Sequence, residues 1–121
     1  MIISGGTVTG SNVFFYNSSG SGLFNFSKNA SITLSAPTSG TYAGMLLKQT
    51  SNTDSILAGT LNGNLDFPNA FLHLDNATGV MMNTGTIFAN HLTLDNSTKV
   101  TMTNIYSSGS STTTNIFALY E

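Results

Sequence analysis

The chain lacks cysteine and arginine and has few charged residues of any kind. Only 7% of its 121 residues are charged, and its basic side chains are three lysines. The absence of cysteine excludes disulfide bonds and thiolate metal sites. The formal net charge of −2 argues against nucleic acid, which would require a basic stripe, and against an anionic membrane surface. The net charge therefore does not point to any class of binding partner.

A long apolar run is also absent. No apolar run approaches the length that a membrane span needs, about 18 residues or more, so we expect no membrane-spanning helix and no direct membrane insertion. The opening residues Met-Ile-Ile-Ser-Gly-Gly do not have the pattern of a signal peptide. If the protein is exported, we expect its signal or anchor to lie upstream of this sequence.

Small polar residues are what the chain has in abundance. Ser, Thr, Asn and Gly together make up about half of it, and 40% of the residues are hydrophobic. The four small residues are mediocre to poor helix formers, and the low charge argues against disorder. A length of 121 residues leaves room for one core. We therefore predict a single domain, residues 1–121, of the all-β class.

One sequence pattern occurs twice in the second half of the chain. Leu72–Met82 reads LHLDNATGVMM, and Leu92–Met102 reads LTLDNSTKVTM. In both copies apolar residues alternate with residues that vary between the copies, on either side of an Asp-Asn turn. This pattern is typical of a strand, a corner and a second strand. A looser copy occupies residues 24–34, with Phe24 and Phe26 in place of the first two leucines.

A repeat this short cannot bury its apolar face alone, so its copies are expected to stack. We predict a right-handed parallel β-solenoid (β-helix) with coils of about 20 residues, its hand following from the preferred hand of parallel crossovers. The near-continuous apolar run Tyr42–Leu47 is expected to be a buried strand, and the polar segment Gln49–Ser55 a protruding loop. The core pairs that we expect are Leu72 with Leu92, Leu74 with Leu94, Val80 with Val100 and Met82 with Met102.

Four runs of the sequence are similar to a known family. They are Val13–Tyr16, Leu34–Met45, Leu65–Ala70 and Leu94–Thr98, and the stretch Ser-Ala-Pro-Thr-Ser-Gly-Thr-Tyr-Ala-Gly is the most specific part. From about Val13 onward the chain resembles the C-terminal region of the TadE/TadG-like proteins associated with bacterial Flp (tight-adherence) pili. The resemblance implies an extracellular or cell-surface structural role and assigns no catalytic residue.

The repeat brings together only two of the acidic residues, Asp75 and Asp95. Stacked carboxylates can bind Ca²⁺ or act as an acid/base pair. Asp-Asn is also favourable corner chemistry, because both side chains bond their own backbone, and this is the interpretation that we adopt. Asn76 and Asn96 are expected to form an amide ladder. We therefore predict no catalytic centre, no cofactor and no metal.

The two histidines are His73 and His91, which raises the question of metal binding. Their spacing is slightly shorter than one repeat, so we expect His73 to stack on Thr93 and His91 on Phe71. By alternation with the leucines, both imidazoles should point outward. We therefore predict that both histidines lie at the surface and bind no metal.

Three classes of function remain open. The first is a structural module of a bacterial surface that assembles into a filament or coat, or serves as a pilus-associated adhesion module. The second is a binding module for a surface polysaccharide or host surface, with outward aromatics such as Tyr16, Phe71 or Tyr106 as its platform. The third, an enzyme of the β-helix carbohydrate-active kind, is disfavoured because the acids are scattered and arginine is absent.

The ends of the chain favour self-association. A stacked parallel fold presents unpaired strand edges at its ends, and neither terminus offers a polar cap. We expect a homo-oligomer or an end-to-end filament in which the Ser107–Thr114 tract is a flexible tether. The residues expected at the contacts are Ile2, Ile3, Ile116, Phe117, Leu119 and Tyr120.

Overall fold

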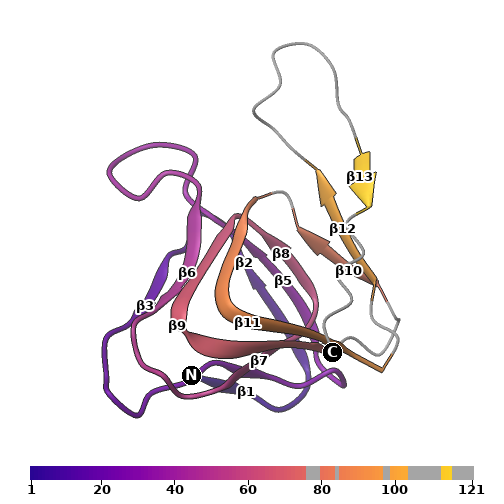
Figure 1. Cartoon of the computed structure of the whole chain (residues 1–121). Coiled ribbons are helices and arrows are strands. Elements are labelled where there is room, and N and C mark those ends of the chain that lie inside the picture. Colours follow the sequence, from indigo (N-terminus) through magenta and orange to yellow (C-terminus); the bar gives the residue numbers. More distant parts are fainter. Residues whose placement is uncertain (76–79, 84, 97–98, 104–112, 116–121) are drawn as a thin grey trace.

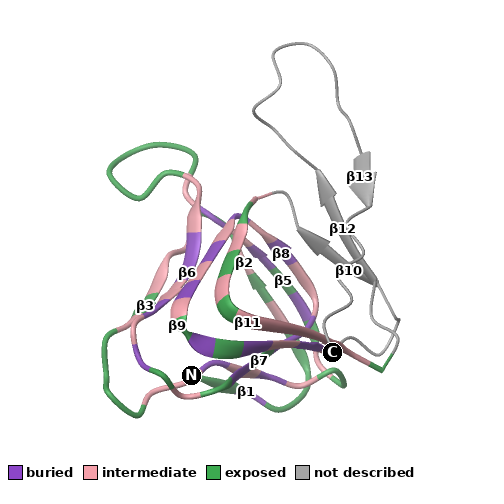
Figure 2. Cartoon of the chain, in the orientation of Figure 1, coloured by how far each residue is buried: buried purple, intermediate pink, exposed green. Residues whose placement is uncertain are grey.

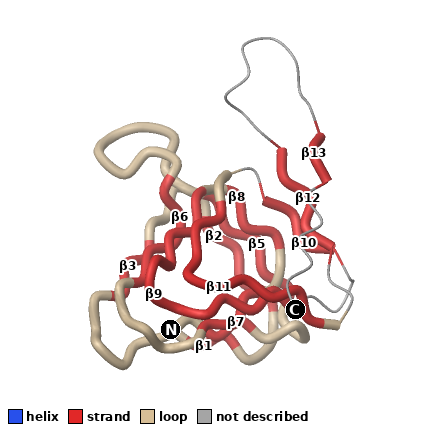
Figure 3. The backbone as a smooth tube through the Cα atoms, in the orientation of Figure 1, coloured by secondary structure: helices blue, strands red, loops and turns tan. Residues whose placement is uncertain are grey.

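The computed structural model describes residues 1–75, 80–83, 85–96, 99–103 and 113–115, and these form strands joined by loops and turns (Figure 3). Their sequences alternate apolar with Ser, Thr or Asn, the pattern of half-buried strands. The strands are β1 (Ile2–Ile3), β2 (Thr7–Gly10), β3 (Phe15–Asn17), β4 (Asn25–Phe26), β5 (Ser31–Ser35), β6 (Met45–Gln49), β7 (Ser55–Leu57), β8 (Thr60–Asn62), β9 (Asn64–Asp75), β10 (Val80–Asn83), β11 (Ile87–Asp95), β12 (Lys99–Thr103) and β13 (Thr113–Asn115).

The strands form two sheets. A seven-stranded sheet has the order β1-β4-β7-β9-β6-β3, with β11 also paired to β9, and a six-stranded sheet has the order β13-β12-β10-β8-β5-β2. The first sheet is curled, because β9 pairs with β6 along its first half and with β7 along its second (Figure 1). Within the described part of the chain, the strand pairs are parallel except β12 with β13. Among the same residues, no helix is long and apolar enough to cross a membrane.

The hydrophobic core lies between the concave side of the curled sheet and the second sheet (Figure 2). Along β9, Leu65, Phe67, Leu72 and Leu74 are buried. The ring of Phe24 packs edge-on against Phe26 and Phe67, with centroids 6.1 and 5.9 Å away. The other fully buried large side chains are Leu34, Leu46, Leu47, Leu57 and Leu61.

The parallel pairing of the repeat copies is confirmed in the curled sheet. Leu92 pairs with Leu72, and Leu94 pairs with Leu74. The first half of the looser copy also occupies its predicted place, because Asn25 pairs with Ile56 and Ile56 pairs with His73. The flanking Phe24 and Phe26 therefore occupy the positions of Leu72 and Leu74, and they are buried as expected. The second half of this copy does not, because Leu34, expected at the position of Met82, is level with Asn83 through Leu61.

The predicted right-handed parallel β-solenoid with coils of about 20 residues is wrong. The structure is a curled parallel half-barrel with a second sheet beside it, and the spacing between paired strands is irregular. Phe15 pairs with Leu47, whereas Ser55 pairs with Leu72 across a much shorter interval of sequence. Surface loops absorb such differences in length at little cost. The period of the repeat is thus local to one pair of strands.

The predicted register of the second sheet is also wrong, because it is shifted by a single position. Val80 pairs with Lys99 and Met81 with Val100, so the two valines and the two methionines are not partners. Leu74 and Leu94 are paired, yet the partner of Met102 is Asn83. The corner between Leu74 and Val80 therefore holds one residue more than the corner between their partners, Leu94 and Lys99. A slip of one residue exchanges the two faces of a strand.

The polar segment Gln49–Ser55 is not a protruding loop, because its key side chains are buried. The hydroxyl of Ser55 donates to Gln49 Oε1 (2.8 Å) and accepts from the Phe24 N–H (3.0 Å). The Gln49 amide donates to the Thr53 carbonyl (2.6 Å). These bonds compensate the burial of polar groups at a bend of the chain. The loop that protrudes instead is 38–43, directly before β6 (Figure 2).

Candidate functional site

Asp75 and Asp95 lie side by side on neighbouring strands, as the repeat predicts. Each carboxylate has its own partner. Asp75 accepts a hydrogen bond from the Asn96 amide (2.8 Å) and lies 3.5 Å from Lys28 Nζ, whereas Asp95 lies 3.1 Å from His73 Nδ1. The Asn96 side chain is therefore hydrogen-bonded to the Asp75 carboxylate. Its predicted ladder partner Asn76 lies outside the described residues.

His73 stacks on Thr93 and His91 on Phe71, both as predicted. The Phe71 and His91 rings meet edge-on with centroids 4.9 Å apart. Asp95 Oδ2 and Thr93 Oγ1 both contact the same His73 nitrogen, Nδ1, at 3.1 and 2.8 Å. Nucleophile activation requires the acid and the hydroxyl on opposite ring nitrogens. This cluster consequently lacks the geometry of a catalytic triad.

No cluster of three or more metal-ligating side chains (His, Cys, Asp or Glu) occurs in the part of the chain that the structure describes. The described ion pairs are Lys28 with Asp75, Lys48 with Asp66 and His73 with Asp95. They are spread over different strands and corners. The ionisable groups thus form separate pairs.

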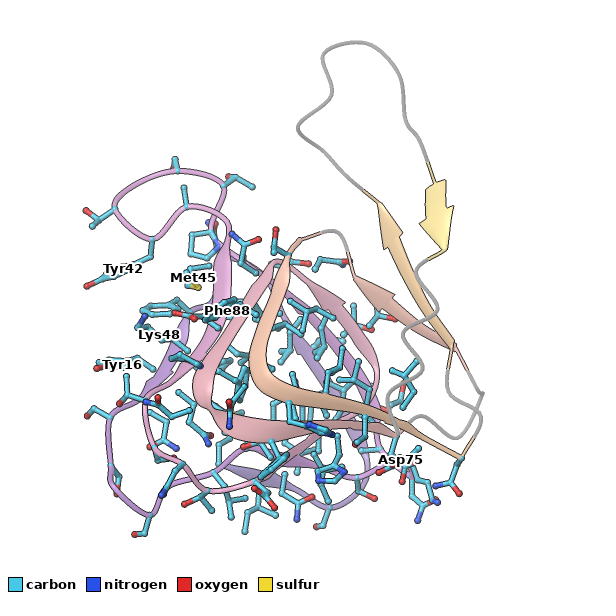
Figure 4. The ribbon with its side chains drawn as sticks, in the orientation of Figure 1. Tyr16, Tyr42, Met45, Lys48, Asp75 and Phe88 are labelled. Carbon is cyan, nitrogen blue, oxygen red and sulfur yellow. The ribbon has the colours of Figure 1, made fainter. Side chains whose placement is uncertain are left out.

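An exposed aromatic face lies on the convex side of the curled sheet. Strand register places Tyr16 beside Lys48, Lys48 beside Asp66 and Asp66 beside Phe88, so these four side chains form one row across β3, β6, β9 and β11. The rings at the two ends of the row are largely exposed, Tyr16 at 55% and Phe88 at 60%. Figure 4 shows them on the same outer side, away from Asp75.

A second tier of rings adjoins this row. Phe14 stacks on Tyr42 with centroids 4.6 Å apart and lies nearly parallel to Tyr16 at 6.4 Å. Tyr42, 57% exposed, belongs to the protruding loop. The base of that loop is closed by a hydrogen bond of 2.7 Å from the Gly44 N–H to the Pro37 carbonyl, so Tyr42 is held at the edge of the face.

Lys48 and Asp66 form the polar centre of the row. The Lys48 ammonium donates to Asp66 Oδ2. This hydrogen bond, which outweighs the opposing effect of desolvation, raises the pKa of Lys48 above its usual value. Lys48 therefore stays protonated at neutral pH, and its positive charge is opposite to that of the adjacent carboxylate. The aromatic face, defined as Phe14, Tyr16, Tyr42, Lys48, Asp66 and Phe88, carries no net charge.

Sequence reasoning identified only part of this face. It named Tyr16 and Phe71 as platform residues, but Phe71 packs with His91 on the other limb of the curled sheet. Tyr42 was expected in a buried strand, whereas the strand begins only at Met45. Phe88 was missed, although its position between Ile87 and Ala89 signals an outward side chain. Tyr106 lies outside the described residues.

The residues predicted to mediate self-association are only partly described. Ile2 is 72% exposed and Ile3 is buried in the core, both on β1. The residues Ile116, Phe117, Leu119 and Tyr120 lie outside the described part. β13 begins within the tract expected to be a tether and pairs antiparallel with β12.

Comparisons with protein-family models, with characterised proteins and with solved structures found no match. They therefore lend no support to the TadE/TadG-like resemblance, which stays a hypothesis from the sequence.

Proposed function

We propose that the chain is a non-catalytic adhesion module of a bacterial surface that binds a neutral polysaccharide on the aromatic face. The observation that carries this proposal is the row from Tyr16 to Phe88, with exposed rings at both ends and a charge-neutral polar pair between them. The extracellular setting is supported by the sequence resemblance and by the abundance of uncharged polar residues.

The chemistry of a sugar chain matches this row. A pyranose ring has an apolar face of C–H groups, which packs on the electron-rich face of an aromatic ring. Its hydroxyls both donate and accept hydrogen bonds, so they can accept from Lys48 and donate to Asp66 at the same time. Three strand spacings of about 4.8 Å separate Tyr16 from Phe88, roughly 14 Å in all, which suits a short oligosaccharide segment.

Two other classes of ligand fit less well. An anionic polymer would be attracted by Lys48 but repelled by the adjacent Asp66. A protein partner would have to remove water from the ion pair, and that desolvation is costly unless new bonds replace it. A neutral sugar chain replaces the water with hydroxyl groups.

The test is binding of cellohexaose and chitohexaose by isothermal titration calorimetry, with polygalacturonate as the anionic comparison. We expect Tyr16→Ala and Phe88→Ala each to weaken binding of a neutral probe about fivefold, because each removes one stacking surface worth roughly 1 kcal/mol. The matched control is Phe71→Ala, which removes an exposed ring from the other limb of the sheet and should leave affinity unchanged.

Failure of the wild-type chain to bind either neutral hexasaccharide, or an equal loss of affinity in the Phe71 variant, would overturn the proposal. Binding of polygalacturonate that survives both face variants would place the ligand site elsewhere and have the same consequence.

A further inference from the structure

The three N-terminal strands lie together at one end of the molecule. β1 and β3 are the two ends of the curled sheet's path, and β2 is an end strand of the second sheet. Within the described residues, each of these strands pairs on one side only, β1 with β4, β2 with β5 and β3 with β6. In the second sheet the opposite edge differs, because β13 already covers the outer edge of β12.

The direction of the backbone groups is fixed by the existing hydrogen bonds. The Gly6 carbonyl accepts from the Ser31 N–H on β5 at 2.8 Å. Successive residues of a strand turn their backbone groups to alternate sides, so those of Thr7 and Thr9 face the open edge of β2. At β1, the Met1 carbonyl accepts from the Asn25 N–H and the Ile3 carbonyl from the Ser27 N–H. The backbone N–H and C=O of Ile2 therefore face outward.

Charged residues, proline and bulges, three protections usual for an open strand edge, are absent from these strands. β1, β2 and β3 contain no charged residue and no proline, and within the described residues no bulge interrupts their pairing. Their side chains also expose apolar surface, since Ile2 is 72% and Tyr16 is 55% exposed. An uncharged edge with exposed apolar residues favours pairing with another strand.

We infer that this N-terminal end is a dimer interface, which pairs with the same end of a second copy. A two-fold axis perpendicular to the second sheet, just outside the open edge of β2 and level with its middle, sets β2 antiparallel to the second copy's β2. The same rotation brings β1 of each copy beside β3 of the other. One symmetric contact thus pairs all three open edges and closes the assembly as a dimer.

The geometry also selects the second copy as the occupant. A symmetric contact must be self-complementary. The three open edges meet this condition, because the two-fold rotation sets β2 against β2 and β1 against β3. Thr7 of one β2 pairs with Thr9 of the other, which joins the outward N–H and C=O groups of both residues. Ile2 lies on one of the strands that meet, so its exposed apolar surface becomes partly covered. A head-to-tail stack would instead place the second copy's β2 where β13 lies.

The test is the molar mass of the full chain in solution by light scattering after size-exclusion chromatography. We expect twice the monomer mass of 12.7 kDa. Thr9→Pro removes an outward N–H without removing a bond to β5, so it should weaken dimerisation at least tenfold. Thr9→Ala is the matched control, because it loses the same hydroxyl but keeps the N–H, and it should remain a dimer.

Hydrogen exchange of the wild-type chain gives a readout that needs no variant. The Thr7 and Thr9 amides should exchange slowly at high protein concentration and rapidly after dilution below the dissociation constant. A wild type that is monomeric at millimolar concentration, a mass that grows beyond the dimer, or exchange at these amides that is independent of concentration would each overturn the inference.

Discussion

Phe67→Ala is expected to lower the free energy of unfolding by about 3–5 kcal/mol, the usual cost of truncating a buried phenylalanine. Phe67 is completely buried in the middle of β9, and its ring packs edge-on against Phe24. The cavity would open in the hydrophobic core beside the Phe24 ring. Because small domains have only about 5–15 kcal/mol of stability in total, a substantial part of it should be lost. Urea denaturation followed by circular dichroism measures the change.

Phe88→Ala is the matched control for this loss. It removes the same side chain from the neighbouring strand, but Phe88 is 60% exposed. We expect its free energy of unfolding to change by less than about 1 kcal/mol. Equal destabilisation by the two substitutions would contradict the assignment of Phe67 to the core and of Phe88 to the surface.

Gly59→Ala is expected to destabilise the chain by roughly 2–4 kcal/mol, the sum of left-handed strain and steric overlap. Gly59 forms the corner between β7 and β8 with φ of 101°. A methyl group there would lie 2.6 Å from the Ile32 carbonyl oxygen and 2.8 Å from its Cβ. Since both atoms belong to strand β5 in the core, neither can move without disturbing the ladder.

Gly40→Ala separates the two effects. Gly40 has a similar φ of 88°, but nothing lies within 4 Å of a Cβ built there. Only the backbone strain of about 1–2 kcal/mol should appear. Thermal unfolding of the two variants measures the difference, and a Gly40 variant as unstable as the Gly59 variant would show that the corner is not closely packed.

The sequence predicted the curled sheet best where the chain repeats itself. Leu72 and Leu74 pair with their counterparts in β11, because both copies carry the same alternation of apolar residues at this point. Phe24 and Phe26 were placed correctly although they lie far from the repeat in the sequence, since burial constrains both copies to the same alternation. The register of β10 was missed because one extra residue between Leu74 and Asn83 is invisible in the pattern of side chains.

The aromatic face was less accessible to sequence reasoning for a physical reason. Its row runs from Tyr16 through Lys48 and Asp66 to Phe88, and these positions are unevenly spaced along the chain. No period relates the intervals, because they depend on the lengths of irregular loops and on a register shift in β6. Alternation alone identifies outward residues but does not say which of them become neighbours.

The most direct test of the central claim is an NMR measurement of the chain bound to the tighter of the two neutral hexasaccharides. We expect nuclear Overhauser effects between sugar C–H protons and the ring protons of both Tyr16 and Phe88, with none to Phe71. Contacts confined to Phe71 and His91, or a bound sugar that contacts no ring of the aromatic face, would contradict the account.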